Sequence, residues 1–184
     1  MGYFLSIEIP DHVVAQLQEF VLPDDENIHP QRREDLHITL AYLGHIKDEK
    51  IDDLIRALKE IEIPPFEIEG QGVTYFGPGA GYRNYFFTAA ITLSDNLKNL
   101  KERIDQICLD HGLKPRRHDN DYNPHITLAR ADVKLSQDQI DHFLEVNKDK
   151  KASGFSVSTF ALYKSQHPKP YLKIRDFKLP VTHV

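Results

Sequence analysis

The sequence predicts an α+β fold with two pseudo-symmetric lobes, each built from a small antiparallel sheet and flanking helices. Short strands alternate with amphipathic helices along the 184 residues. Their order is β-α-β-α-β, a glycine-rich turn at 77–81, and then β-α-β-α-β-β, so the two halves repeat one arrangement. A pentapeptide also occurs twice, once in each half. Helices placed between such strands indicate sheets that are covered by helices rather than an all-β or all-α protein.

Strands are expected where apolar and polar residues alternate, or where β-branched and aromatic residues are dense. In chain order these segments are 3–9, 36–43, 66–75, 84–93, 124–129, 154–163 and 171–179. Helices are expected where apolar residues recur at helical spacing. They are 11–20, 48–61, 97–108 and 136–144. Gly112 is placed to end the third helix and Ser136 to cap the fourth, whereas the proline-containing segment 22–34 is expected to be a loop.

We treat residues 1–184 as a single domain whose lobes span roughly 1–76 and 82–184. The two halves are too interdependent in size to be separate domains, and an exchange of strands between them is compatible with the pattern. A chain of this length buries roughly 70% of its unfolded surface, so its stability requires neither a disulfide nor a metal. We expect a monomer.

Composition excludes several classes of protein. A single cysteine, Cys108, rules out an internal disulfide and a cysteine-based zinc site. Cys108 lies in the apolar stripe of the third helix, which indicates a buried thiol in a reducing compartment, so we expect a cytoplasmic protein. We expect no membrane span and no signal peptide, because the apolar runs are short and Glu8 interrupts the first of them. A net charge of -5 argues against a protein that binds the nucleic-acid backbone over a broad surface, but not against a pocket that binds one phosphate.

The repeated pentapeptide is the strongest functional signal in the sequence. The segment His37-Ile38-Thr39-Leu40-Ala41 recurs as His125-Ile126-Thr127-Leu128-Ala129. Such a repeat arises by chance in roughly one of 200 chains of this length. Both copies also fall on the strand between the two helices of their half, which indicates a duplication.

Each copy places its polar side chains on one face of a strand. His37 and Thr39 share a face, as do His125 and Thr127, and the two positions lie about 6.5 Å apart. If the lobes face one another across a two-fold axis, the four side chains converge. Two imidazoles can then serve as general base and general acid near neutral pH, and two hydroxyls can donate to phosphate oxygens. This set suits attack on phosphorus, with no cofactor and no metal.

The repeat has two other interpretations. One histidine on a strand is more often structural or solvated than functional. Packing, however, requires only that the isoleucine and leucine recur, not the histidine and threonine. A metal site is the sharper alternative, but each strand lacks a carboxylate or a second imidazole at ligand spacing, and two histidines fall short of the three ligands usual for catalytic zinc.

The paired His-x-Thr motifs resemble those of the 2H phosphoesterase superfamily, and most closely those of the RNA 2′,3′-cyclic phosphodiesterases, also called 2′-5′ RNA ligases of the LigT type. The similar segments extend over nearly the whole chain. They are YFLSIEIP at 3–10, EDLHITLAYLG at 34–44, PFEI at 65–68, YFGP at 75–78, PHITLAR at 124–130 and FALYKS at 160–165. One departure is the segment HPQRR at 29–33, where many relatives carry an aromatic residue before the first motif.

The resemblance implies an active-site cleft between two antiparallel sheets. It implies hydrolysis of 2′,3′-cyclic phosphates, on RNA ends or cyclic nucleotides, to 2′-phosphates, with the reverse 2′-5′ ligation as a second activity. It makes His37 the general acid, His125 the general base, and Thr39 and Thr127 the ligands of the phosphate.

The resemblance also places Arg130 near the phosphate and Tyr42 near the substrate base. From the residues alone, Arg130 falls on the opposite face from Thr127 unless a bulge or the end of the strand turns it inward. Tyr42 is equally well explained as a core aromatic residue.

Two further functions stay open at this point. One is a sibling activity toward ADP-ribose cyclic phosphate or 2′,5′-oligoadenylate. The other is a non-catalytic module that binds RNA ends. All four motif residues are intact, which favours an enzyme over the non-catalytic module.

Overall fold

The structure, a computed structural model, describes residues 2–78, 84–115, 122–166 and 170–181. Part of the glycine-rich turn, 79–81, lies outside these residues. The strands are β1 (Tyr3–Glu8), β2 (Ile28–Pro30), β3 (His37–Gly44), β4 (Phe66–Ile68), β5 (Gly70–Phe76), β6 (Tyr85–Ile91), β7 (His125–Ala131), β8 (Phe155–Val157), β9 (Thr159–Lys164) and β10 (Leu172–Lys178). The helices are α1 (Asp11–Leu17), α2 (Asp48–Leu58), α3 (Asp95–Asp110), α4 (Gln137–Val146) and the short 3-10 helix η1 (Arg33–Asp35).

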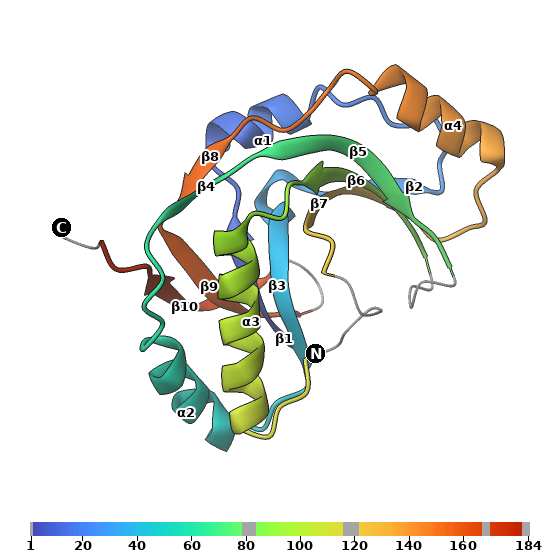
Figure 1. Cartoon of the computed structure of the whole chain (residues 1–184). Coiled ribbons are helices and arrows are strands. Elements are labelled where there is room, and N and C mark those ends of the chain that lie inside the picture. The colour runs from blue at the N-terminus through green and yellow to red at the C-terminus, as the bar shows by residue number, and fades with distance from the viewer. Residues whose placement is uncertain (1, 79–83, 116–121, 167–169, 182–184) are drawn as a thin grey trace.

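Eight of the strands form one antiparallel sheet in the order β10-β9-β1-β3-β7-β6-β5, with β2 paired to β7 (Figure 1). β4 and β8 form a second sheet of two strands. The expected α+β class is confirmed. The expectation of a separate sheet in each half is not what the described strands show, because the two halves of the large sheet join where β3 meets β7 at the single pair Ile38–Ile126.

The strands on the two sides of this junction correspond to one another. β1 lies beside β3 and places Glu8 opposite His37. β6 lies beside β7 in the same way and places Ala90 opposite His125. The flanking strands continue each side, because β9 pairs with β1 and β5 pairs with β6, so strands from both halves of the sequence meet on each side. The two motifs therefore have equivalent backbone surroundings but different neighbouring side chains.

The helices cover the apolar face of the sheet. α3 packs against β3 and α2, and α4 packs against β5 (Figure 1). Leu40, Ile104 and Phe143 lie in the same buried core. Cys108 is fully buried, as predicted, and burial raises the pKa of its thiol to about 12. No helix within the described ranges is long and apolar enough to cross a membrane.

The predicted roles of Gly112 at the end of α3 and of Ser136 at the start of α4 are confirmed. The N–H of Leu113 donates to the carbonyl of Cys108 over 2.8 Å, and that of Gly112 donates to Leu109 over 2.9 Å. Gly112 has φ = +67°, the left-handed conformation that this termination requires. Ser136 caps α4 in a capping box with Gln139.

Three expected segments differ from the structure. The segment 22–34, expected as a loop, contains β2 and the start of η1. β2 has only three residues and ends in Pro30, so its own sequence carries almost no strand signal, and it forms by pairing with the end of β7. The expected strands 66–75 and 154–163 are each divided in two, because β4 and β8 pair with one another whereas β5 and β9 join the large sheet.

Candidate active site

The two His-x-Thr motifs meet at the junction of β3 and β7. Ile38 and Ile126 are Cα partners there, and both side chains are fully buried. In an antiparallel pair, continuing this register by one residue in each direction sets His37 toward Thr127 and Thr39 toward His125. All four polar side chains belong to the face opposite the buried isoleucines, where each is only partly buried.

Both imidazole rings are held by the backbone through Nδ1. In His37 this nitrogen lies 2.7 Å from the carbonyl oxygen of Asp35, and in His125 it lies 2.8 Å from the carbonyl oxygen of Asn123. A carbonyl can only accept a hydrogen bond, so Nδ1 carries the proton in both rings. Nε2 is therefore the atom that can exchange a proton with a ligand, and in His37 it lies 3.1 Å from Oγ1 of Thr39.

Aromatic side chains pack against each imidazole. The His37 ring lies 5.1 Å from Phe4 and 5.8 Å from Tyr171, measured between ring centroids. The His125 ring lies 4.7 Å from Phe76. These contacts restrict rotation of the rings and leave each nitrogen in a defined direction.

A bulge follows the threonine in each copy. Thr39 lies opposite Ser6 and Ala41 opposite Leu5, so Leu40 is an extra residue on β3. β7 has the same irregularity between its threonine and its alanine. An extra residue reverses the alternation of side chains.

The bulges bring Tyr42 and Arg130 to the face of the motifs. Leucine and alanine of both copies are buried, whereas Tyr42 is half-buried and Arg130 is exposed. Arg130 donates to Asp132, with Nε 3.0 Å from Oδ1. A Cβ on Gly2 would lie 2.6 Å from the Tyr42 hydroxyl, so this ring packs closely on the start of β1. The bulge that Arg130 required is present, and the roles of both residues stay predictions.

Tyr122 is a residue that the sequence analysis missed. Its hydroxyl donates to the carbonyl of Thr39 over 2.9 Å and so ties the segment before the second motif to the first motif. Burial raises the pKa of this tyrosine, and the charge of Asp105 raises it further. The available signal was a lone aromatic residue in a polar segment three positions before His125.

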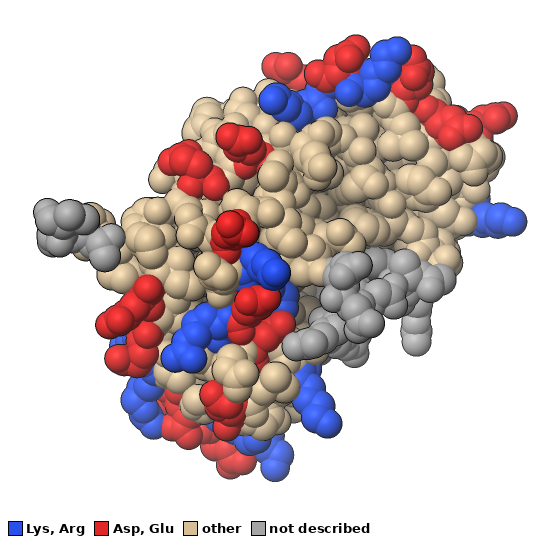
Figure 2. Space-filling view, in the orientation of Figure 1, with Lys and Arg blue, Asp and Glu red and all other residues tan. Residues whose placement is uncertain are grey.

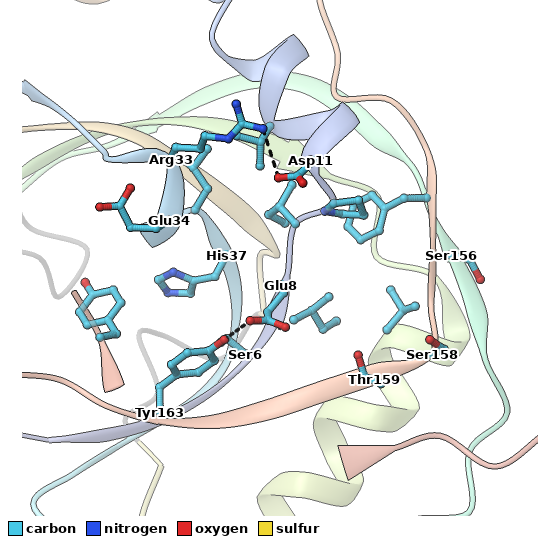
Figure 3. A pocket seen from close by; sticks show the side chains of 18 of the residues that line it. Ser6, Glu8, Asp11, Arg33, Glu34, His37, Ser156, Ser158, Thr159 and Tyr163 are labelled. Carbon is cyan, nitrogen blue, oxygen red and sulfur yellow. Dashed lines mark hydrogen bonds and ion pairs between the residues drawn. The ribbon is translucent and has the colours of Figure 1, made fainter. Parts of the chain in front are cut away.

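A pocket of about 630 Å³ opens beside His37. Figure 3 shows Glu8, Glu34 and Tyr163 around the imidazole, and Tyr171 lines the same pocket. Burial raises the pKa of Glu8, but hydrogen bonds from Lys173 and Tyr163 outweigh it and leave the pKa below its usual value. The carboxylate is therefore ionised at neutral pH. The sequence analysis did not single out Glu8.

In Figure 2 the charged side chains gather along the upper edge and at the lower left, where basic residues lie next to acidic ones, and the surface between these groups carries few charges. This face has no continuous basic surface, which agrees with the net charge of -5. Among the residues that the structure describes, no three His, Cys, Asp or Glu side chains gather in a group that could hold a metal ion.

Comparisons with known proteins point to one family. Residues 9–169 match the family profile of the 2′-5′ RNA ligase superfamily. The chain is 26% identical over 166 residues to an RNA 2′,3′-cyclic phosphodiesterase of Methanocaldococcus jannaschii, covering 90% of this chain and 91% of the relative. It is 31% identical over 135 residues to the protein of that name in Bacillus subtilis, covering 70% of each chain.

Solved structures share the fold. The TT0787 protein of Thermus thermophilus superposes with a TM-score of 0.74 at 24% identity, over the whole of both chains. Escherichia coli LigT in complex with 3′-AMP superposes with a TM-score of 0.70 at 20% identity, over 97% of each chain. At these identities the likeness establishes the fold.

The Tyr122 hydrogen bond gives a first prediction. Tyr122→Phe leaves the carbonyl of Thr39 without its hydroxyl donor and should lower the free energy of unfolding by about 1–3 kcal/mol. Denaturant unfolding measures this change. Tyr75→Phe is the control, because this hydroxyl has no hydrogen bond to a described residue, and it should change stability by much less. Equal stability of the two variants would contradict the structural role of Tyr122.

Proposed function

Because the chain belongs to the 2′-5′ RNA ligase superfamily, we propose that it is a metal-independent phosphodiesterase that opens 2′,3′-cyclic phosphates to 2′-phosphates. Its substrates are RNA ends or cyclic nucleotides. The observation that carries the proposal is the Ile38–Ile126 pair, which sets two His-x-Thr motifs side by side on one face. The names of the relatives support the same substrate class.

In the proposed reaction, Nε2 of His125 takes a proton from water as the water oxygen attacks phosphorus. The bond from phosphorus to O3′ breaks, and Nε2 of His37 donates a proton to the leaving O3′. The product keeps its phosphate on O2′. Both Nδ1 atoms stay bonded to backbone carbonyls at 2.7 and 2.8 Å, so each ring exchanges protons with the substrate through one nitrogen only.

The threonines serve as donors to the non-bridging oxygens of the phosphate. Charge grows on these oxygens during attack, so a hydroxyl aimed at them stabilises the transition state more than the substrate. Arg130 supplies positive charge at the same face, and Tyr42 offers a ring to the base. When the 5′-hydroxyl of a second RNA end replaces water as the nucleophile, the same step gives 2′-5′ ligation.

The assay that tests this function offers the protein 2′,3′-cyclic mononucleotides and oligonucleotides with cyclic phosphate ends, in buffer with excess EDTA. We expect turnover to a 2′-phosphate, identified by phosphorus NMR. Loss of activity in EDTA with recovery on addition of Zn²⁺ or Mn²⁺ would contradict the mechanism. Turnover of ADP-ribose cyclic phosphate or 2′,5′-oligoadenylate alone would assign the sibling activity instead.

The threonine hydroxyls give the next prediction. Thr39→Ala and Thr127→Ala should each lower kcat/KM by the equivalent of about 1–3 kcal/mol of transition-state stabilisation, because each removes a hydroxyl donor to a charged oxygen. Thr→Ser at the same positions restores the hydroxyl and should recover most of the rate. Normal turnover by both folded alanine variants would show that the hydroxyls are structural.

The two histidines can be distinguished by the leaving group. A nitrophenyl phosphodiester releases a phenolate that needs no proton, so His37→Ala should be largely rescued on this substrate while His125→Ala stays inactive. Rates of both variants on this ester and on a cyclic nucleotide provide the comparison. Rescue of His125→Ala instead would reverse the two roles.

A further inference from the structure

The residues that lie opposite the two histidines on the neighbouring strands differ in charge. Glu8 lies opposite His37 on the neighbouring strand, and Ala90 lies opposite His125. Residues directly opposite in an antiparallel pair project from the same face, with Cβ atoms about 4.5–5.5 Å apart. One imidazole therefore has a carboxylate beside it where the other has a methyl group.

The Glu8 carboxylate is held in place. Lys173 Nζ lies 2.9 Å from one of its oxygens, and Tyr163 donates to the other. Lys173 also lies 3.2 Å from Asp176, so one ammonium is shared between two carboxylates. The cluster of Glu8, Lys173 and Asp176 thus keeps a net negative charge.

The other charged groups near His37 add to this charge. Glu34 and Asp11 line the same pocket from η1 and α1, together with Arg33. Arg33 is paired with Asp11 at 3.1 Å. Arg32 forms ion pairs with two carboxylates of η1, with Asp35 at 2.9 Å and with Glu34 at 3.4 Å. The phenols Tyr163 and Tyr171 line the same pocket, and the Tyr171 ring lies 5.8 Å from that of His37.

The described surroundings of His125 are different. Its neighbour on β6 is Ala90, and its aromatic neighbour from β5 is Phe76. The charged residue of its own strand is Arg130, which lies five residues further along β7 and forms an ion pair with Asp132, and His29 of β2 lies 3.7 Å from the same aspartate.

We infer that Glu8 is a positioning residue that keeps His37 protonated and thereby makes it the general acid of the pair. The assignment of a catalytic role rests on the proposed function, whereas the coupling between Glu8 and His37 does not. A carboxylate beside an imidazole stabilises the imidazolium, and the other imidazole then stays neutral and available as base. Glu8 acts through His37 and does not touch the reacting atoms.

The test is a titration of the His37 ring by proton NMR in the free protein, with its signal assigned by its absence in His37→Gln. Glu8→Gln keeps the shape and the hydrogen-bond acceptor but removes the charge. It should lower the pKa of His37 by about 0.5–1 unit, the effect of one charge at this range in a partly solvated site. Lys173→Met removes the opposite charge and should raise the pKa of His37.

The two expected shifts in the pKa of His37 have opposite signs, which distinguishes electrostatic coupling from a structural effect. Damage to the site would shift this pKa in the same direction in both variants. Glu102→Gln on α3 is the control, an exposed carboxylate on a helix that contributes no residue to the pocket, and it should leave the pKa of His37 unchanged. In turnover, the alkaline limb of the rate profile should move down in pH for Glu8→Gln while the acidic limb stays in place.

An unchanged His37 pKa in Glu8→Gln, or shifts of equal sign in the two variants, would overturn the inference. Absence of turnover on every cyclic phosphate would overturn the proposed function, and the NMR titration would still decide whether Glu8 and His37 are coupled.

Discussion

The pairing of Ile38 with Ile126 is the contact on which the polar site depends. Both side chains are fully buried, so the core fixes which residues of β3 and β7 face one another. A slip of one residue on either strand would turn its histidine and threonine into the core and expose its isoleucine. Such a slip would bury polar groups without partners, which costs several kcal/mol. Hydrophobic packing on one face therefore holds the geometry of the other.

The bulge after each threonine also keeps a polar side chain out of the core. On a regular strand, Arg130 would point with Leu128 into the core, where an unpaired guanidinium is strongly disfavoured. The extra residue lets Leu128 and Ala129 both remain buried while Arg130 stays at the surface, and Tyr42 occupies the matching position on β3. The duplicated pentapeptide thus carries a duplicated backbone irregularity as well as its side chains.

Alternation and helical periodicity were enough to predict the α+β class and the two faces of each motif, and Gly112 and Ser136 indicated where α3 ends and where α4 begins. They could not predict which strands become neighbours, because a side-chain pattern defines a face and not its partner. For that reason the place of Glu8 in the site was not predicted, since its position opposite His37 arises only when β1 pairs with β3. The face of Arg130 was undecidable for a related reason, because a bulge is defined by two residues against one on the adjacent strand. Tyr122 lay in a segment with no regular pattern.

In a duplicated site, the repeated residues alone cannot decide which histidine acts as the acid and which as the base. Each imidazole is bonded through Nδ1 to an equivalent backbone carbonyl, and each has a threonine two residues further along its strand. Nothing within the repeat therefore makes the two rings differ in proton affinity. Acid–base catalysis needs one protonated and one neutral imidazole at the same time, and a difference in proton affinity decides which of the two rings holds the proton. The difference must therefore come from residues outside the repeat, and at the position opposite each histidine the chain has a glutamate on one side and an alanine on the other. Since Lys173 is shared with Asp176, its ion pair anchors the Glu8 carboxylate without cancelling the charge of the cluster as a whole.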